Sequence, residues 1–476
     1  MVQYYRWSYG VRLTKDVFAE ACCNRLMANL LHSNARNVLE WYDFALFGFF
    51  SDIISQVFFP PEDDGEENPQ SNRNLIISFF IFGGAFLVRP IGGLLIGYVG
   101  DKYGRKQALT QSLFLMAIPT TLMGCLPSYE TAGILSPICL CVCRLLQGIS
   151  VGGQLPASLV YTVESRDPSE WGFYGALPMM AANSGTLLGN IVGAVMKDNL
   201  SKEQLLNWGW RIPFSSGILI ALVAQWLKNH GANVHTTVGV YDHEDAPVQN
   251  PIRLAFARGN RIALLSSSLV PILWAGGFFV TFVWMGIYMS HLLNPPIPGA
   301  FWINATSMVF GLTLMLPVAG ALSDKIGRVR VMSMAALGLT IGGPILLLLI
   351  SGGNGYVAFG CQLILGLHLS FFGGPLSAWM VESFSPEVRL TSASLGYDLA
   401  HSVVGGFSPA IATVLYDSCG TKCAGVLYSI FGITSLVGLY LNLFCGNSPD
   451  RQTKEPISKD VEGGDREVAQ ELREFT

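Results

Sequence analysis

Long apolar runs separated by short polar segments recur along almost the whole chain. Twelve runs each hold about 20 mainly apolar residues, the length that a helix needs to cross a membrane. Hydrophobic residues are continuous within the runs and do not alternate with polar ones, which excludes a membrane barrel. We therefore predict an all-α membrane protein of twelve transmembrane helices. The runs cover residues 37–59, 74–99, 108–126, 134–161, 172–196, 209–227, 262–290, 300–322, 331–350, 354–381, 390–416 and 424–446.

Composition and the distribution of basic residues support this class and give it an orientation. Hydrophobic residues fill 51% of the 476 positions and charged residues only 13%, too few to cover soluble domains. If both termini lie on one side, 22 of the 29 Lys and Arg residues fall on that side and 5 on the other. Because cytoplasmic loops are enriched in Lys and Arg, we expect both termini in the cytoplasm. We favour the plasma membrane over an organelle.

A charged turn occurs once in each half of the chain. Residues 101–105 (Asp-Lys-Tyr-Gly-Arg) follow the second apolar run, and residues 324–328 (Asp-Lys-Ile-Gly-Arg) follow the eighth. Glycine permits a tight reversal between two helices, and basic residues hold the loop in the cytoplasm. A repeat of half the chain inside a membrane protein is typical of secondary transporters.

A second internal repeat involves two glutamates. Glu164 ends the fourth run within Tyr-Thr-Val-Glu-Ser, and Glu382 ends the tenth within Trp-Met-Val-Glu-Ser. Arg389 follows Glu382 by seven positions, whereas Trp171 stands at the equivalent place in the first half. Arg166 is then the candidate partner of Glu164.

The repeats divide the chain into five parts. Two pseudo-symmetric six-helix halves cover residues 37–227 and 262–446. A polar cytoplasmic linker, 228–261, joins them, while residues 1–36 form a cytoplasmic arm and 447–476 a cytoplasmic tail.

Ionisable residues inside the apolar runs are costly and therefore candidates for function. Glu40 and Asp43 are three positions apart, which places them on one face of the first helix. They either carry a coupled proton, with Asp43 the deeper candidate, or mark the membrane interface. Asp398 and His401 share a face of the eleventh helix, where they either relay a proton or pair with each other.

Two arginines in the membrane favour a substrate with a carboxylate. Arg144 remains charged and binds a carboxylate or pairs with a nearby acid, and Arg89 has the same two alternatives. A zwitterion would also satisfy one arginine, with its cation over an aromatic ring. The candidate substrate-binding residues have polar or aromatic side chains: Arg89, Arg144, Gln147, Gln154, Asn183 and Trp274.

Several segments together resemble the metabolite:H⁺ symporters of the major facilitator superfamily. They are residues 37–44 (Asn-Val-Leu-Glu-Trp-Tyr-Asp-Phe), 89–93 (Arg-Pro-Ile-Gly-Gly), 144–153, 208–214 and 389–397. That subgroup contains the proline/betaine, 2-oxoglutarate, citrate and shikimate carriers. The resemblance implies the major facilitator fold of two six-helix halves.

The resemblance also assigns roles to the repeated charged residues. In that family they form an inner gate that stabilises one of two access states. The corresponding residues here are Asp101, Gly104, Arg105, Glu164, Asp324, Gly327, Arg328, Glu382 and Arg389. Relatives usually have glutamate where this chain has Gln154, so proton coupling here uses Asp43, Glu40 or the residues of the eleventh helix, or is absent.

We therefore expect a proton-coupled symporter of a small carboxylate-bearing or zwitterionic metabolite. An uncoupled facilitator and a ligand-sensing receptor are the alternatives. The chain carries no nucleophile, metal or phosphate motif, so we expect neither an enzyme, nor a cofactor beyond the coupling proton, nor a nucleic-acid partner. We expect a monomer in the lipid bilayer. Cys419 and Cys423 share a short loop before the last helix and can form a local disulfide.

Overall fold

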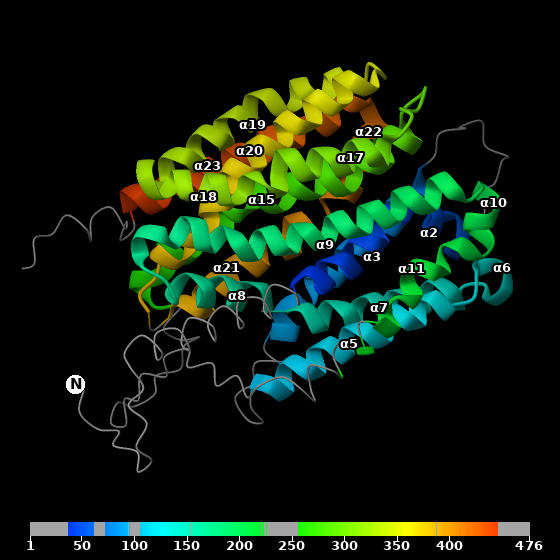
Figure 1. Cartoon of the computed structure of the whole chain (residues 1–476), viewed down its shortest axis with the longest axis horizontal. Coiled ribbons are helices and arrows are strands. Elements are labelled where there is room, and N and C mark those ends of the chain that lie inside the picture. The colour runs from blue at the N-terminus through cyan, green and yellow to red at the C-terminus, as the bar shows by residue number, and fades with distance from the viewer. Residues whose placement is uncertain are drawn as a thin grey trace, which may run out of the picture.

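The chain is helical almost throughout the part that the structure describes. This computed structural model describes residues 37–60, 72–93, 95, 105–152, 154–219, 221, 222, 225, 256–386 and 388–445. Within these ranges nine helices are long and apolar enough to cross a membrane. Figure 1 shows long helices that run side by side along one direction. The predicted all-α membrane class is confirmed.

The first half of the chain supplies the helices drawn from blue to green in Figure 1. Its first span is helical over residues 37–49 and continues as α2 (Ser51–Phe58). The predicted span at 209–227 is described only in part. The other elements are α3 (Arg73–Leu87), α5 (Arg105–Cys125), α6 (Tyr129–Ala132), α7 (Leu135–Val151), α8 (Gln154–Glu164), α9 (Trp171–Asn199), α10 (Lys202–Gln204) and α11 (Arg211–Ser215).

The second half contains three spans with π-helical turns near their middle. These turns cover Phe279–Trp284, Met308–Thr313 and His401–Gly405, and the apolar pattern did not predict them. A further π-helical turn, Tyr288–Leu292, ends the first of these spans. The elements of this half are α14 (Arg261–Leu269), α15 (Pro271–Phe278), α16 (Met285–Ile287), α17 (Ala300–Ser307), α18 (Met315–Ile326), α19 (Arg328–Ile350), α20 (Gly355–Glu382), α21 (Arg389–Ala400), α22 (Ser408–Cys419) and α23 (Thr421–Cys445).

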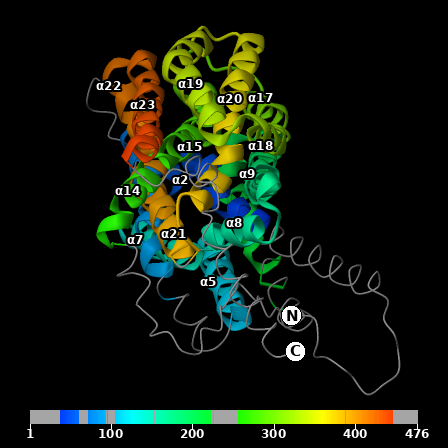
Figure 2. The same cartoon turned by 90° about the vertical axis from the view of Figure 1, so that its left-hand side faces the viewer.

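The two halves pack side by side along their length. Figure 2 shows α19, α20 and α23 on one side, α5 and α7 on the other, and α2, α9 and α15 between them. Across the interface α9 packs against α18 and α20, and α3 packs against α22. The span over residues 261–292 is buried without interruption from 273 to 289, so its middle and later part lie at the centre of the molecule.

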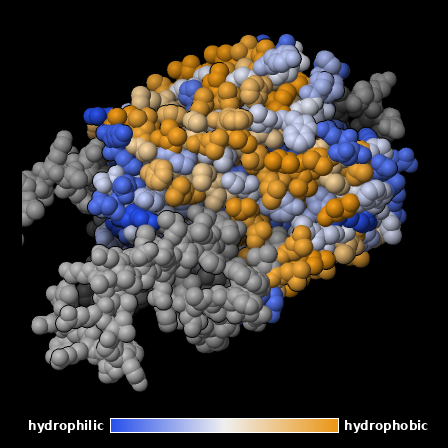
Figure 3. Space-filling model, in the orientation of Figure 1, coloured by the Kyte–Doolittle hydropathy of each residue, from blue (hydrophilic) through white to orange (hydrophobic). Residues whose placement is uncertain are grey.

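The outer surface carries the apolar side chains that the runs predict. Figure 3 shows hydrophobic residues across the middle of one face and hydrophilic residues gathered toward its two ends. Leu219, Met334 and Ile341 are each more than 60% exposed, as expected for side chains that contact lipid.

Glycines bring α3 and its continuation (89–93) into backbone contact with α7. A methyl group added at Gly148 would lie 1.9 Å from the carbonyl oxygen of Ala85. One added at Gly152 would lie 2.0 Å from the carbonyl oxygen of Arg89. Small residues of this kind allow membrane helices to approach closely. The contact fixes the position of Arg89 relative to α7, which carries Arg144.

Candidate functional site

Asp43 lies at the centre of a buried hydrogen-bond network between three helices of the first half. The Thr120 hydroxyl of α5 donates to Oδ1 of Asp43 at 2.6 Å, and the Gln147 amide of α7 donates to Oδ2 at 2.7 Å. Arg144 Nη1 donates to Oε1 of Gln147 at 2.9 Å, one turn away on α7. All four side chains are at most 1% exposed. Gln147 therefore links the carboxylate of Asp43 to the guanidinium of Arg144.

The Arg144 guanidinium is surrounded by aromatic rings. It lies 4.4 Å from the ring centre of Phe47, 4.9 Å from Phe44 and 5.4 Å from Phe82. Such contacts stabilise a desolvated cation. Among the described residues, Nε and Nη2 of Arg144 have no hydrogen-bond acceptor. Arg144 thus retains two donors for a ligand.

A second cluster of charges joins the two halves. Arg89, in the helical residues 89–93 that continue α3, lies 3.7 Å from Asp398 of α21, measured between Nη2 and Oδ1. Glu40 interacts electrostatically with Arg89, Asp398 and Asp43. Its carboxylate is buried, and neither oxygen receives a hydrogen bond from any described residue. The His401 ring stacks on Tyr397 with ring centres 4.0 Å apart.

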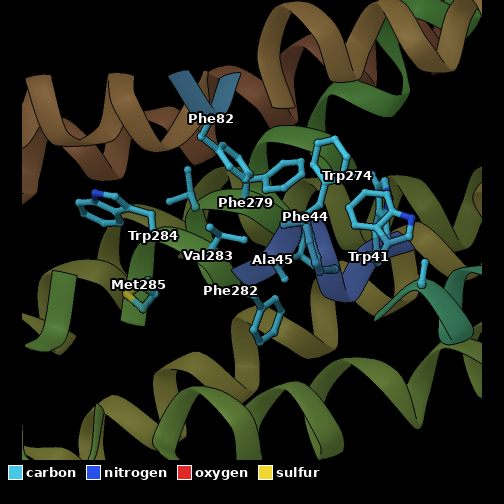
Figure 4. Packing of buried hydrophobic residues seen from close by; sticks show 14 of the residues in the cluster. Trp41, Phe44, Ala45, Phe82, Trp274, Phe279, Phe282, Val283, Trp284 and Met285 are labelled. Atoms are coloured by element: carbon cyan, nitrogen blue, oxygen red, sulfur yellow. The ribbon is translucent and has the colours of Figure 1, made fainter. Parts of the chain in front are cut away.

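An aromatic cluster lies between the halves near these charges (Figure 4). Trp41 packs against Phe278 and Phe279, each with ring centres 6.2 Å away, and Trp274 stacks on Phe278 at 5.7 Å. Within the described part of the chain, the Trp41 indole N–H has no acceptor.

Two of the candidate substrate-binding residues, Gln154 and Asn183, do not have the geometry that the sequence predicted. In one continuous helix, Arg144, Gln147 and Gln154 of the fourth span would form a single polar stripe at helical spacing. The helix is instead broken at Gly152, whose backbone is non-helical (φ −55°, ψ 125°). Spacing across this break therefore does not place Gln154 on the stripe of Arg144, and its side chain lies outside the described residues. The Asn183 amide donates to the Met179 carbonyl oxygen of its own helix at 2.6 Å, so one of its two N–H groups is already used.

The charged turn of the second half joins the two halves at one end of the bundle, on the left in Figure 1. Asp324 accepts hydrogen bonds from the backbone N–H groups of Gly172 (2.9 Å) and Phe173 (3.0 Å) at the start of α9. It also pairs with Arg328 at 2.5 Å, and Arg328 contacts Glu382 at 3.2 Å. A carboxylate at a helix N-terminus is favourable.

The turn itself reverses at Gly327, whose φ of +99° favours glycine, as the sequence predicted. Asp101 and Gly104 lie outside the described residues. Arg105 begins α5, but its side chain is likewise outside the description.

Pairing of the repeated glutamates differs from the sequence prediction. Arg389 of the second half binds Glu164 of the first half at 2.7 Å, whereas Arg166 lies over the Tyr174 ring. Arg166 was therefore the wrong partner. Glu382, seven positions before Arg389, instead contacts Arg328. Spacing within one half could not find a pair whose members come from different halves.

The opposite end of the bundle has its own contacts between the halves. Lys197 of α9 binds both oxygens of Asp52 at 2.8 Å and lies 4.1 Å from the Phe301 ring centre. The Trp302 indole N–H donates to Asp198 at 2.5 Å. These residues line a cavity of about 260 Å³. Cys419 and Cys423 form a disulfide, as the sequence allowed.

Sequence reasoning missed three residues of this site. Thr120 is an ordinary threonine in an apolar run, and only its hydrogen bond to Asp43 distinguishes it. Trp41 and Phe279 resemble packing residues in sequence. The one sequence signal that Trp41 belongs to the site was its position next to Glu40.

Comparison with known proteins identifies the family. Residues 30–227 match the family of sugar and other transporters, and residues 293–475 match the major facilitator superfamily. The chain is 30% identical to the alpha-ketoglutarate permease of Escherichia coli, over 84% of this chain and 89% of the permease. It is 31% identical to a citrate-proton symporter of Klebsiella pneumoniae, over 83% and 86% of the two chains.

Further relatives and solved structures agree. A proline/betaine transporter of Salmonella typhimurium is 27% identical over 90% of this chain and 85% of its own length. A solved structure of the proton:xylose symporter XylE has a TM-score of 0.66 at 18% identity, covering 88% of this chain and 95% of XylE. That likeness shows the fold alone. The chain therefore belongs to the major facilitator superfamily of membrane transporters, within its metabolite:H⁺ symporter subgroup.

Proposed function

We propose that this transporter imports a small carboxylate-bearing metabolite together with protons. The observation that carries the proposal is the guanidinium of Arg144, buried at the centre with two unused donors and held in place by Gln147. Arginine binds carboxylates through two parallel hydrogen bonds, a geometry that these donors can supply. The relatives include a citrate-proton symporter and an alpha-ketoglutarate permease, whose cargoes are carboxylates.

A zwitterionic substrate is the second candidate. A carboxylate bound to Arg144 would leave a cationic group near the aromatic cluster of Trp41, Trp274 and Phe278, where ring faces attract cations. The relatives named proline/betaine transporters have such cargoes. A facilitator without coupling is the alternative that Gln154 suggests.

Alternating access would proceed by opening one end of the bundle at a time. Asp324 and the Glu164–Arg389 pair hold the halves together at one end, and the Asp198–Trp302 contact holds them at the other. We assign the Asp324 end to the cytoplasm, because Lys and Arg dominate the segments expected there. The transporter would act as a monomer in the plasma membrane.

Uptake into proteoliposomes tests the proposed function. We expect an imposed inward proton gradient to drive accumulation of a di- or tricarboxylate, or of a betaine, from a small panel of both. At one proton per substrate, a gradient of about one pH unit sustains about tenfold accumulation. Equal substrate concentrations inside and outside, with or without the gradient, would identify a facilitator instead.

The Asp324 end gives a second test. In Asp324→Asn the charge that accepts two backbone N–H bonds of α9 is lost, and with it about 1.5–3 kcal/mol of charge-assisted hydrogen bonding. We expect the inward-open population to rise about tenfold or more. Thiol labelling of a Ser377→Cys variant measures the change. Ser377 is a buried residue of α20, in the same half of the chain as Asp324.

Asp167→Asn is the matched control. Asp167 is an exposed aspartate in the connection just before α9, and it accepts hydrogen bonds from the backbone N–H and the hydroxyl of Ser169. The control should leave labelling unchanged. If Asp324→Asn also leaves labelling at the unmodified level, the turn has no gating role.

A further inference from the structure

We propose that Glu40 carries the coupled proton. When this proton leaves, Arg89 moves from Asp398 and pairs with the Glu40 carboxylate instead. The inference rests on the proposed proton symport and names the residues responsible for it. Asp43 lies deeper in the same helix and was the candidate that the sequence favoured. We assign it a different role, that of a counter-ion that stays charged.

The two carboxylates of helix 37–49 have opposite hydrogen-bonding environments. Both oxygens of Asp43 accept hydrogen bonds, one from Thr120 at 2.6 Å and one from Gln147 at 2.7 Å. Donors of this kind stabilise the ionised form of a carboxylate. Asp43 is therefore suited to remain charged and to balance the buried cation of Arg144.

Glu40 lacks such donors. It is 2% exposed, and neither of its oxygens receives a hydrogen bond from the described residues. An ionised carboxylate in this position would be desolvated without compensation, whereas the neutral acid avoids most of that cost. In the arrangement seen here Glu40 is accordingly the carboxyl group that holds a proton.

The groups that face Glu40 come from three helices. Asp43 is on its own helix, Arg89 is on the continuation of α3, and Asp398 and Tyr397 are on α21. His401, which follows α21, stacks on the Tyr397 ring. Arg89 is thus the cation that both Glu40 and Asp398 can attract, since Arg89 and not Arg144 acts on Glu40.

The Arg89–Asp398 contact is loose enough to exchange. At 3.7 Å it exceeds the length of a direct hydrogen bond, and within the described residues Nε and Nη2 of Arg89 lack hydrogen-bond partners. This contact crosses from one half to the other, whereas Glu40 and Arg89 belong to the same half. A move of Arg89 toward Glu40 therefore removes a tie between the halves.

These features define one cycle of proton movement. A proton from water on the outer side binds a carboxylate oxygen of Glu40, and Arg89 then pairs with Asp398 across the interface. After the transporter opens inward, Glu40 releases the same proton to cytoplasmic water and its carboxylate attracts Arg89. In the inward-open state Asp398, which has lost Arg89, is solvated by the same cytoplasmic water and stays ionised. Glu40 is then the group that gains and loses the proton, so one proton crosses in each cycle.

Glu40→Gln, a permanent analogue of the neutral acid, tests the inference in proteoliposomes. We expect it to lose accumulation driven by a proton gradient while substrate counterflow continues and no longer varies with pH. Glu40→Asp should retain a pH-dependent counterflow. Asp43→Asn should lower counterflow and accumulation together, because it disturbs the network of Arg144. Accumulation by Glu40→Gln at the unmodified level would overturn the inference.

Carbodiimide labelling gives a second measurement. It uses the unmodified protein and so does not depend on whether a substituted protein folds. Dicyclohexylcarbodiimide reacts with protonated carboxyl groups in apolar surroundings, so we expect its adduct on Glu40, with less adduct as pH rises. An adduct on Asp43 without one on Glu40 contradicts the inference. An unmodified protein that is indifferent to a proton gradient would instead overturn the symport itself, and the inference with it.

Discussion

Replacement of Arg144 by alanine is expected to reduce uptake by about 100-fold or more, because two hydrogen bonds to a charged group contribute roughly 3 kcal/mol or more. The loss should appear in binding as well as in transport, since two donors of this guanidinium lack acceptors among the described residues. Initial uptake rates and substrate protection against thermal unfolding measure the two effects.

The protein should still fold without this guanidinium. Asp43 keeps its hydrogen bonds from Thr120 and Gln147 in the Arg144→Ala variant, so no carboxylate oxygen loses its donor. Having lost its counter-ion, Asp43 can take up a proton instead of remaining an unpaired buried charge. Arg144→Lys should restore little activity, because an ammonium group lacks the planar pair of donors. Arg330→Ala, the same change at an exposed arginine, is the control. Uptake by Arg144→Ala within a few-fold of the control would exclude this residue from the substrate site.

Most of the fold could be predicted from the sequence because membrane helices satisfy their backbone hydrogen bonds internally. Continuous apolar runs therefore mark their own ends, and the span predicted at 300–322 appears as α17 and α18 with the π-helical turn Met308–Thr313 between them. The reversal at Gly327 was equally predictable, since its tight turn follows from local sequence.

The partners of the buried charges were far less predictable. Hydropathy places a residue along the membrane normal, but it does not specify which face of a helix meets which neighbour. Asp43 was recognised as a buried acid, yet its donors come from two other helices. The Glu164–Arg389 pair likewise joins residues 225 positions apart. Such contacts depend on how whole helices pack.

Helix breaks were the second source of error. The interruption at Gly152 changed the side-chain register in the span that carries Arg144, and a helical wheel cannot follow such a break. The break coincides with a close backbone approach, since a methyl group at Gly152 would lie 2.4 Å from the Gly93 nitrogen. Two adjacent glycines in an apolar run were thus a sequence signal for both the helix break and the close backbone approach.

Gly148→Val is expected to destabilise the protein by about 3 kcal/mol or more, a large effect for one substitution, because backbone atoms cannot move aside as a side chain can. A Cβ at Gly148 would lie 1.9 Å from the Ala85 carbonyl oxygen and 2.6 Å from Cγ2 of Val88. The helices must separate to admit it, and Arg89, one residue beyond Val88, would move with the backbone. The amount of protein in the membrane and its thermal unfolding in detergent measure the loss.

Gly84→Val provides the matched control, because it adds the same side chain on α3 at a position with no atom within 4 Å of the new Cβ. The control should remain abundant and active. The only expected effect on its stability is the small difference in helix propensity between valine and glycine. Gly148→Ala should lie between the two, since its single methyl group already meets the carbonyl oxygen. Equal stability of Gly148→Val and Gly84→Val would mean that α3 and α7 are further apart than the glycines indicate, and that the positions of Arg89 and Arg144 do not depend on this contact.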